Sequence, residues 1–146
     1  MKSVFDKTTR DELINRISSL NENSTARWGK MNVYQMLKHC RLWEEMLLGK
    51  KQYRQSFLGR LFGKIALKNM LKDEPMKPNL PTVPSFKISD NGDVAAAKTE
   101  WIGLIAEHGG QENRGIVHPF FGNLTAEQAG RIAYKHIDHH LRQFKS

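Results

Sequence analysis

The sequence predicts an all-α fold, an antiparallel four-helix bundle with one long proline-rich crossover connection. Several segments repeat apolar residues at helical spacing, and most of them begin with a residue that caps helices well. No stretch of useful length alternates apolar and polar residues as a strand does. The 146 residues suffice for one compact domain with its own core. We therefore expect a single helical domain over residues 1–146.

The first two helices are marked by their capping residues. We expect one over 9–20, because Thr9 has a glutamate three residues on, the spacing of a capping box. The second should run over 32–49, because Asn32 is a good N-cap and Gly49 stands where helices commonly end. Apolar residues at helical spacing fill this second segment: Val33, Met36, Leu37, Cys40, Trp43 and Leu47.

Residues 57–72 give a third amphipathic pattern. Gly59 and Gly63 each weaken a helix by about 1 kcal/mol relative to alanine, so a shorter or interrupted helix is expected here. The apolar residues of 57–67 are the candidate surface for a homodimer. A basic residue recurs every four positions and forms a stripe, which predicts a solvated helix face, with membrane-surface or other anion contact as the alternative. The stripe consists of Arg60, Lys64, Lys68 and Lys72.

A proline-rich stretch separates these helices from the rest of the chain. Residues 75–84 hold four of the five prolines, which block helix and favour extended chain. We interpret this stretch as the crossover connection. Helical patterns resume over 93–108, capped by Asp93 and ended by two glycines, and over 125–144, capped by Thr125 with a glutamine in the capping-box position.

Composition limits the class of protein. No run of about 18 apolar residues occurs, so no membrane span is expected. The first residues carry no secretory pattern, and the single cysteine forms no internal disulfide, which together favour a cytoplasmic location. The formal net charge of +8 attracts anions. No nucleic-acid-binding motif accompanies that charge, so we expect no specific nucleic-acid partner.

Three of the six histidines lie within residues 136–140 of the last expected helix. His136 and His140 are four residues apart, so they project from one helix face, one turn apart. In that geometry two imidazoles can share one metal ion. From spacing alone, packed or surface histidines are the competing interpretation.

His39 strengthens the metal hypothesis. It lies in the middle of the second helix, on an inward-facing row with Met36 and Trp43. A bundle can place it opposite the row formed by His136 and His140, although a core or boundary histidine is the alternative. Three imidazole donors suit Zn²⁺, Ni²⁺ or a similar ion and leave positions for water or substrate.

The remaining histidines and the cysteine receive other interpretations. His139 points about 100° away from its neighbour, so we expect it to support the site or to be exposed. His108 ends a helix, where the dipole favours its cation, and a structural role is expected. His118 precedes a proline and either lines the mouth of a site or shapes its loop. Cys40 is expected to be a small buried apolar residue and not a nucleophile.

The histidine segments resemble a known superfamily. Segment 136–143 (HIDHHLRQ) is similar to the last-helix signature of DinB-like proteins, in which a histidine precedes a His-His pair and then a glutamine. Segment 28–40 is similar to the helix that places one histidine in the site of those proteins. Segments 78–82 and 118–125 resemble a DinB-like subgroup of unknown function, so the resemblance covers nearly the whole chain.

The resemblance implies one divalent metal ion, Zn or Ni, held by His39, His136 and His140. Some relatives are metal-dependent enzymes that transfer or isomerise substrates with a low-molecular-weight thiol. We therefore expect a small-molecule substrate or thiol as partner, and transferase, isomerase or hydrolase chemistry in which the ion activates a thiol or water. His139, Tyr34 and Gln143 are candidates for orienting the ligands or relaying protons.

Two other functions stay open at the level of sequence. The first is a non-catalytic metal-binding or stress-response module, whose metal site would be closed to solvent. The second is a basic nucleic-acid-binding protein, whose affinity would fall steeply with salt.

Overall fold

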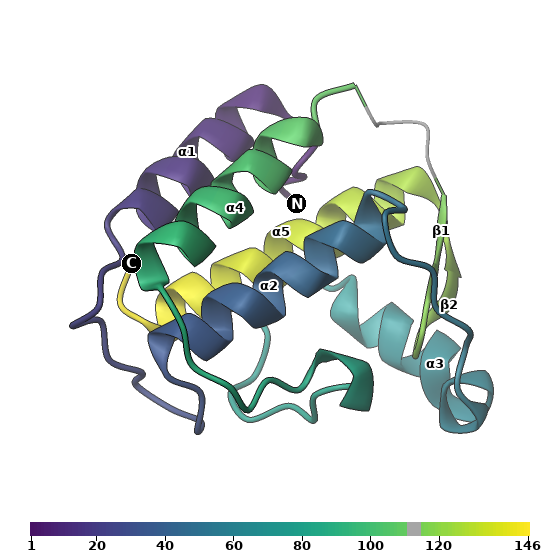
Figure 1. Cartoon of the computed structure of the whole chain (residues 1–146). Helices are drawn as coiled ribbons and strands as arrows, with labels where there is room; N and C mark the ends of the chain where they lie inside the picture. Colours follow the sequence, from purple (N-terminus) through teal and green to yellow (C-terminus); the bar gives the residue numbers. More distant parts are fainter. Residues whose placement is uncertain (111–114) are drawn as a thin grey trace.

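The computed structural model describes residues 1–110 and 115–146 and is mostly helical (Figure 1). The start of the loop expected after Gly110 lies outside the described residues. A short 3₁₀ helix, η1 (Pro84–Phe86), and a two-stranded sheet, β1 (Ile116–His118) and β2 (Gly122–Leu124), accompany the α-helices. The α-helices are α1 (Lys7–Ser18), α2 (Val33–Leu47), α3 (Phe57–Met70), α4 (Val94–Glu107) and α5 (Ala126–Gln143).

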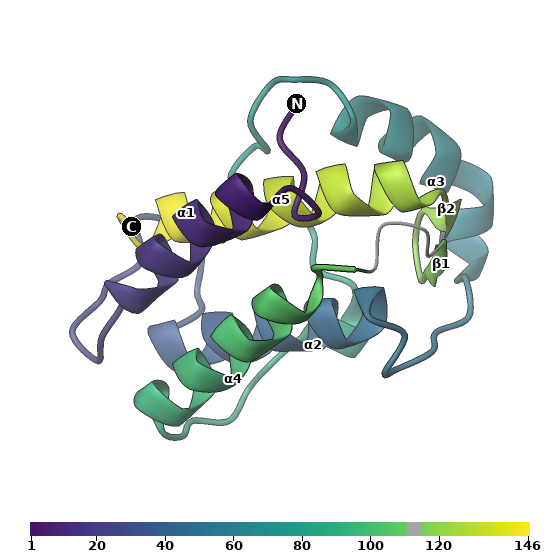
Figure 2. The ribbon, with the colours of Figure 1, turned by 90° about the horizontal axis from the view of Figure 1, so that it is seen from above.

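Four helices pack around a common core, and α3 lies to one side (Figures 1 and 2). Both α1 and α2 contact α4 and α5. In each of the pairs α1/α4 and α2/α5 the helices run in opposite directions. The prediction of a wholly antiparallel arrangement is wrong for two pairs, because α2 and α4 run in the same direction and so do α1 and α5. The long connection between them returns the chain to the end of the bundle where α2 began.

The capping residues fix where most helices begin. Asn32 and Thr125 each form the full capping box with a glutamine, and Asp93 accepts a hydrogen bond from the backbone of Ala96, as predicted. The range expected for the first helix, 9–20, lies about half a turn toward the C-terminus of the observed α1, Lys7–Ser18. Asp6 caps this helix, and its carboxylate accepts hydrogen bonds from both the backbone and the hydroxyl group of Thr9. Thr9 therefore lies inside the first turn and does not cap the helix.

The proline-rich connection crosses the outside of the bundle in the predicted region. It contains no α-helix, only η1, which lies against α2. Phe86, the last residue of η1, is buried in the core next to the middle of α2. Proline fixes the extended backbone on either side, and this one apolar side chain attaches the connection to the bundle.

The structure corrects the prediction that α3 is a shorter or interrupted helix. The helix is continuous, and its two glycines are the positions at which it packs. A Cβ atom on Gly59 or Gly63 would lie 2.5 or 2.2 Å from the carbonyl oxygen of Phe120, so only glycine permits this approach. The large apolar residues of α3 point away from the bundle and are exposed.

The β1–β2 hairpin was not predicted. Its strands have three residues each and pair antiparallel, with Val117 opposite Asn123 and His118 opposite Gly122. Strands this short show no periodicity that a sequence pattern could detect. Gly122 has a positive φ of 78°, which suits glycine and allows the tight return of the chain.

The core also contains a buried ionisable pair that joins α2 to the end of α4. Glu44 is fully buried, and its Oε2 lies 2.5 Å from Nε2 of His108. The predicted structural role of His108 is consistent with this contact, although Glu44 supplies the partner that the sequence did not suggest. Among the described residues, no helix is both long and apolar enough to cross a membrane.

Candidate metal centre

Three histidines from two helices meet inside the bundle. His39 lies in the middle of α2, and His136 and His140 lie one turn apart on α5. Each side chain is nearly buried, with 4–6% of its surface exposed. One ring nitrogen of each residue can be chosen so that all three lie within 4.8 Å of one another. The predicted meeting of these histidines is therefore confirmed, and they are positioned to bind a metal ion.

The connection between α3 and α4 orients His39. Nδ1 of His39 lies 2.9 Å from the backbone carbonyl oxygen of Phe86. A carbonyl oxygen only accepts hydrogen bonds, so Nδ1 carries the proton and donates it. Nε2 of His39 consequently keeps its lone pair, and this nitrogen faces His136.

A short chain of hydrogen bonds orients His140 in the same way. Nδ1 of His140 lies 2.8 Å from Oε1 of Gln143, and the amide group of Gln143 donates to the carbonyl oxygen of Trp28 at 2.7 Å. The hydrogen bond to Trp28 shows which end of the Gln143 amide carries the nitrogen. The other end is the oxygen, which therefore accepts from Nδ1–H of His140. Gly29 permits the arrangement, because a Cβ atom there would lie 2.9 Å from the Gln143 nitrogen. Nε2 of His140 is left free to bind a ligand.

His136 is held by stacking. Its ring lies parallel to the ring of Trp43, with centroids 4.1 Å apart and planes inclined by 13°. Nε2 of His136 lies 2.9 Å from Nε2 of His39, whereas its Nδ1 has no hydrogen-bond partner among the described residues. Two nitrogens bound to one ion at about 2.0–2.1 Å lie roughly 3 to 3.4 Å apart, which is close to the observed separation. His39 and His136 therefore already have the spacing of two ligands of one small divalent ion, and His140 lies close enough to complete a candidate set of three.

Burial keeps all three imidazoles uncharged. It lowers the pKa of His39, and it is the largest cause of the pKa of His136 and that of His140 lying well below the ordinary value. For His136 and His140 the neighbouring histidines lower the pKa further, because like charges repel. Neutral imidazole is the form that binds metal, so the ring nitrogens are in the required protonation state at neutral pH.

His139 lies beside the three ligands without joining them. It is buried and not exposed, and its ring packs at 5.5 Å from the indole ring of Trp28. Plain exposure is therefore excluded, and the expected supporting role stays a prediction. Burial is the main cause that lowers the pKa of His139.

His118 shapes the hairpin turn from inside the protein. Its Nδ1 accepts hydrogen bonds from the backbone N–H groups of Phe120 and Phe121, both at 3.0 Å. Its ring stacks on Phe121 and also contacts the ring of Trp43. Trp43 in turn stacks on His136. Of the two predicted roles, the loop-shaping one is observed. Burial lowers the pKa of His118 to about 3.

The sequence did not single out several residues that build the centre. Phe86 and Trp28 orient the ligands through their backbone carbonyl groups, so residue type carried little signal for this role. Of the three candidates for a supporting role, Gln143 holds a ligand directly. Tyr34 instead packs next to Gly92 and Lys38. Cys40 is buried, as predicted, and burial raises its pKa well above the usual range.

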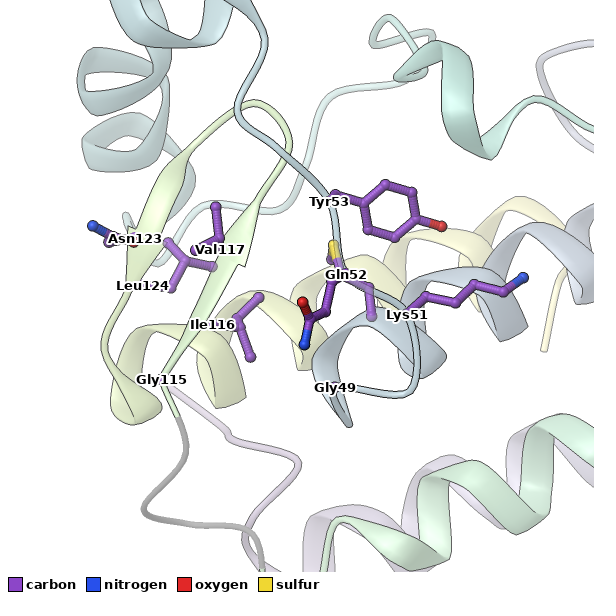
Figure 3. Close-up of a pocket in the computed structure, with 10 residues that line it drawn as sticks. Gly49, Lys51, Gln52, Tyr53, Gly115, Ile116, Val117, Asn123 and Leu124 are labelled. Carbon is purple, nitrogen blue, oxygen red and sulfur yellow. The ribbon is translucent and has the colours of Figure 1, made fainter.

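A cavity of about 540 Å³ lies between the end of α2, the loop that follows it and the hairpin (Figure 3). Its lining includes the polar residues Lys51, Gln52 and Asn123. Tyr53, which also lines this cavity, packs its ring against Phe86 at 5.2 Å. The three histidines are not among its lining residues, although Phe86 contacts both Tyr53 and His39.

Comparison with known proteins places the chain in a family. Residues 2–146 match the model of a family described as a protein of unknown function (DUF1569), and the chain belongs to this family. Searches of the curated proteins and of the solved structures found no match.

Proposed function

We propose that this protein is a metal-dependent enzyme in which His39, His136 and His140 hold one divalent ion, Zn or Ni. One observation carries the proposal: three neutral imidazoles from two helices converge, and two of them are oriented by Nδ1–H donors so that Nε2 faces the common point. The resemblance of segments 28–40 and 136–143 to DinB-like proteins supports the same ligand set.

Three protein ligands leave coordination positions for an exogenous group. An ion bound in this way would lower the pKa of a coordinated thiol or water and make it nucleophilic at neutral pH. The chain's own contribution is to hold the ligands and exclude bulk water. Gln143 and the Phe86 carbonyl keep the imidazole rings in one tautomer, and Trp43 fixes the plane of His136. A thiol-dependent transferase or isomerase, or a hydrolase, is the reaction class that we infer.

Elemental analysis of the purified protein tests the ligand set. We expect about one metal ion per chain in the wild type and a large loss in His39→Ala, His136→Ala and His140→Ala, because two imidazoles bind such an ion far more weakly than three. His139→Asn is the matched control, since His139 is also buried on α5 next to a ligand. Metal content that is unchanged in the three ligand variants would contradict the proposal.

A non-catalytic metal-binding module is the second candidate, and the near-complete burial of all three ligands favours it. Cobalt substitution separates the two functions, because the visible spectrum of Co²⁺ reports its coordination. An enzyme should show a changed spectrum when a small thiol is added, followed by metal-dependent turnover of small electrophiles. A spectrum that stays constant at saturating thiol would favour the closed, non-catalytic site.

A further inference from the structure

Helix α3 is attached to the rest of the protein by its smallest residues. Gly59 and Gly63 lie against the backbone of Phe120 in the hairpin turn, and Leu67 is buried one turn further on. Lys135 of α5 holds the far end, where its ammonium group donates to the carbonyl oxygen of Met70 at 2.6 Å. The inner face of α3 is thus fully used in packing.

The outer face of α3 carries the largest apolar side chains of the helix. They are between 55% and 73% exposed, although burial of large apolar side chains is favourable. Five such residues within nine positions form a contiguous patch, unlike the isolated apolar residues that are ordinary on protein surfaces. The patch consists of Phe57, Leu58, Leu61, Phe62 and Ile65.

Basic residues border this patch along one side. Arg60, Lys64 and Lys68 are exposed, and they follow one another at four-residue spacing along the helix. In the described part of the chain none of them takes part in an ion pair. Helix α3 contains no acidic residue that could neutralise them. The outer face therefore combines exposed apolar area with uncompensated positive charge.

We propose that the outer face of α3 docks on the surface of an anionic lipid bilayer. Apolar side chains would enter the boundary between headgroups and acyl chains, and the bordering basic residues would remain among the anionic headgroups. An anionic bilayer thus matches both the exposed apolar area and the uncompensated positive charge of this face. The helix would lie in the plane of the membrane surface, and the metal centre, buried between α2 and α5, takes no part in the contact.

A second copy of this chain is a poorer fit to the same face. In a two-fold symmetric dimer each partner presents the same surface. Pairing through α3 would place the two basic rows within one interface, with no acidic residue of either helix to separate them. The net charge of +8 on each chain adds further repulsion.

Vesicle co-sedimentation with the full chain tests the proposal. The wild type should bind vesicles of phosphatidylcholine mixed with phosphatidylglycerol, and bind vesicles of phosphatidylcholine alone much more weakly. Arg60→Gln/Lys64→Gln/Lys68→Gln should lower the affinity on the order of a hundredfold, from about fivefold per basic residue near an anionic surface. Leu61→Ser/Phe62→Ser/Ile65→Ser should abolish binding by removing the apolar contact.

The controls separate this contact from general attraction of a basic protein. Lys30→Gln/Lys77→Gln/Lys87→Gln removes the same charge at exposed positions outside α3 and should bind like the wild type. Thermal unfolding should be unchanged in every variant, since all substituted side chains are exposed. The proposal is overturned if the wild type does not bind anionic vesicles, if the serine variant still binds them, or if both triple glutamine variants lose affinity equally. A wild-type dimer that the serine variant converts to monomer, without vesicle binding, would assign the face to a second copy.

Discussion

At the scale of single residues, the candidate metal centre depends on groups that fix the tautomers of His39 and His140. An imidazole can present Nε2 to an ion only when Nδ1 carries the proton, and a carbonyl or amide oxygen at Nδ1 enforces that choice. Phe86 does this for His39 through its backbone, whereas Gln143 does it for His140 through its side chain. Only the second of these can be changed by substitution without moving the chain.

Substitutions of Gln143 should therefore change metal affinity without removing a ligand. We expect Gln143→Leu to weaken binding by about 10- to 100-fold, the usual effect of losing a partner that orients a ligand. Gln143→Glu retains an acceptor for Nδ1–H of His140 but cannot donate to the carbonyl oxygen of Trp28, so its affinity should lie between those of Gln143→Leu and the wild type. Competition with a chromophoric chelator measures both values. Equal affinities in Gln143→Leu and the wild type would show that the hydrogen bond does not position His140.

At the scale of secondary structure elements, α3 shows how one residue type can have opposite effects. Glycine is unfavourable inside a helix, yet Gly59 and Gly63 allow this helix to approach the hairpin backbone. No close contact requires glycine at position 103 in α4, because a Cβ atom on Gly103 would meet nothing within 4 Å. The three positions lie in helices of equal length, so they offer a direct comparison.

Alanine substitutions should consequently have opposite signs. Gly103→Ala should raise the free energy of unfolding by about 0.5–1 kcal/mol through helix propensity alone. Gly63→Ala should lower it by about 1–3 kcal/mol, because the new methyl group would overlap the Phe120 carbonyl and force the helix away from the hairpin. Urea unfolding of both variants gives the two values. A stabilised Gly63→Ala protein would mean that α3 does not pack as described.

At the scale of the whole molecule, buried neutral histidines make stability depend on pH. The pKa of His118 is about 3 in the folded protein, against about 6.5 in an unfolded chain. Between these values the unfolded chain binds a proton that the folded protein does not. Stability is therefore lost as the pH falls below about 6.5, and His118 exerts no such effect above it.

Replacing His118 should reduce this acid sensitivity. Asparagine at this position can still accept a hydrogen bond from the backbone two residues on, but it does not titrate. Between pH 7.5 and pH 5 we expect the wild type to lose about 2 kcal/mol more unfolding free energy than His118→Asn, from about 1.4 kcal/mol per pH unit below 6.5. Urea unfolding in the presence of a chelator measures this difference. Parallel pH profiles for the two proteins would show that His118 is not kept neutral.

The sequence by itself indicated the α-helices and three candidate metal ligands. Capping residues such as Asn32 and Thr125 act locally, through hydrogen bonds to backbone three residues away, so their effect is readable without a fold. The spacing of His136 and His140 is equally local, because helical geometry alone places them on one face. The inward row of His39 then indicated a third donor.

Tertiary structure alone decided which groups surround those ligands and which way α3 faces. The carbonyl groups of Phe86 and Trp28 orient two histidines, but every residue carries a carbonyl, so no residue type marked them. Glu44 and His108 meet across two helices for the same reason, since sequence separation hides contacts made by packing. For α3 the pattern indicated an amphipathic helix correctly, but the approach of the hairpin turned its glycines inward and left its large apolar residues exposed.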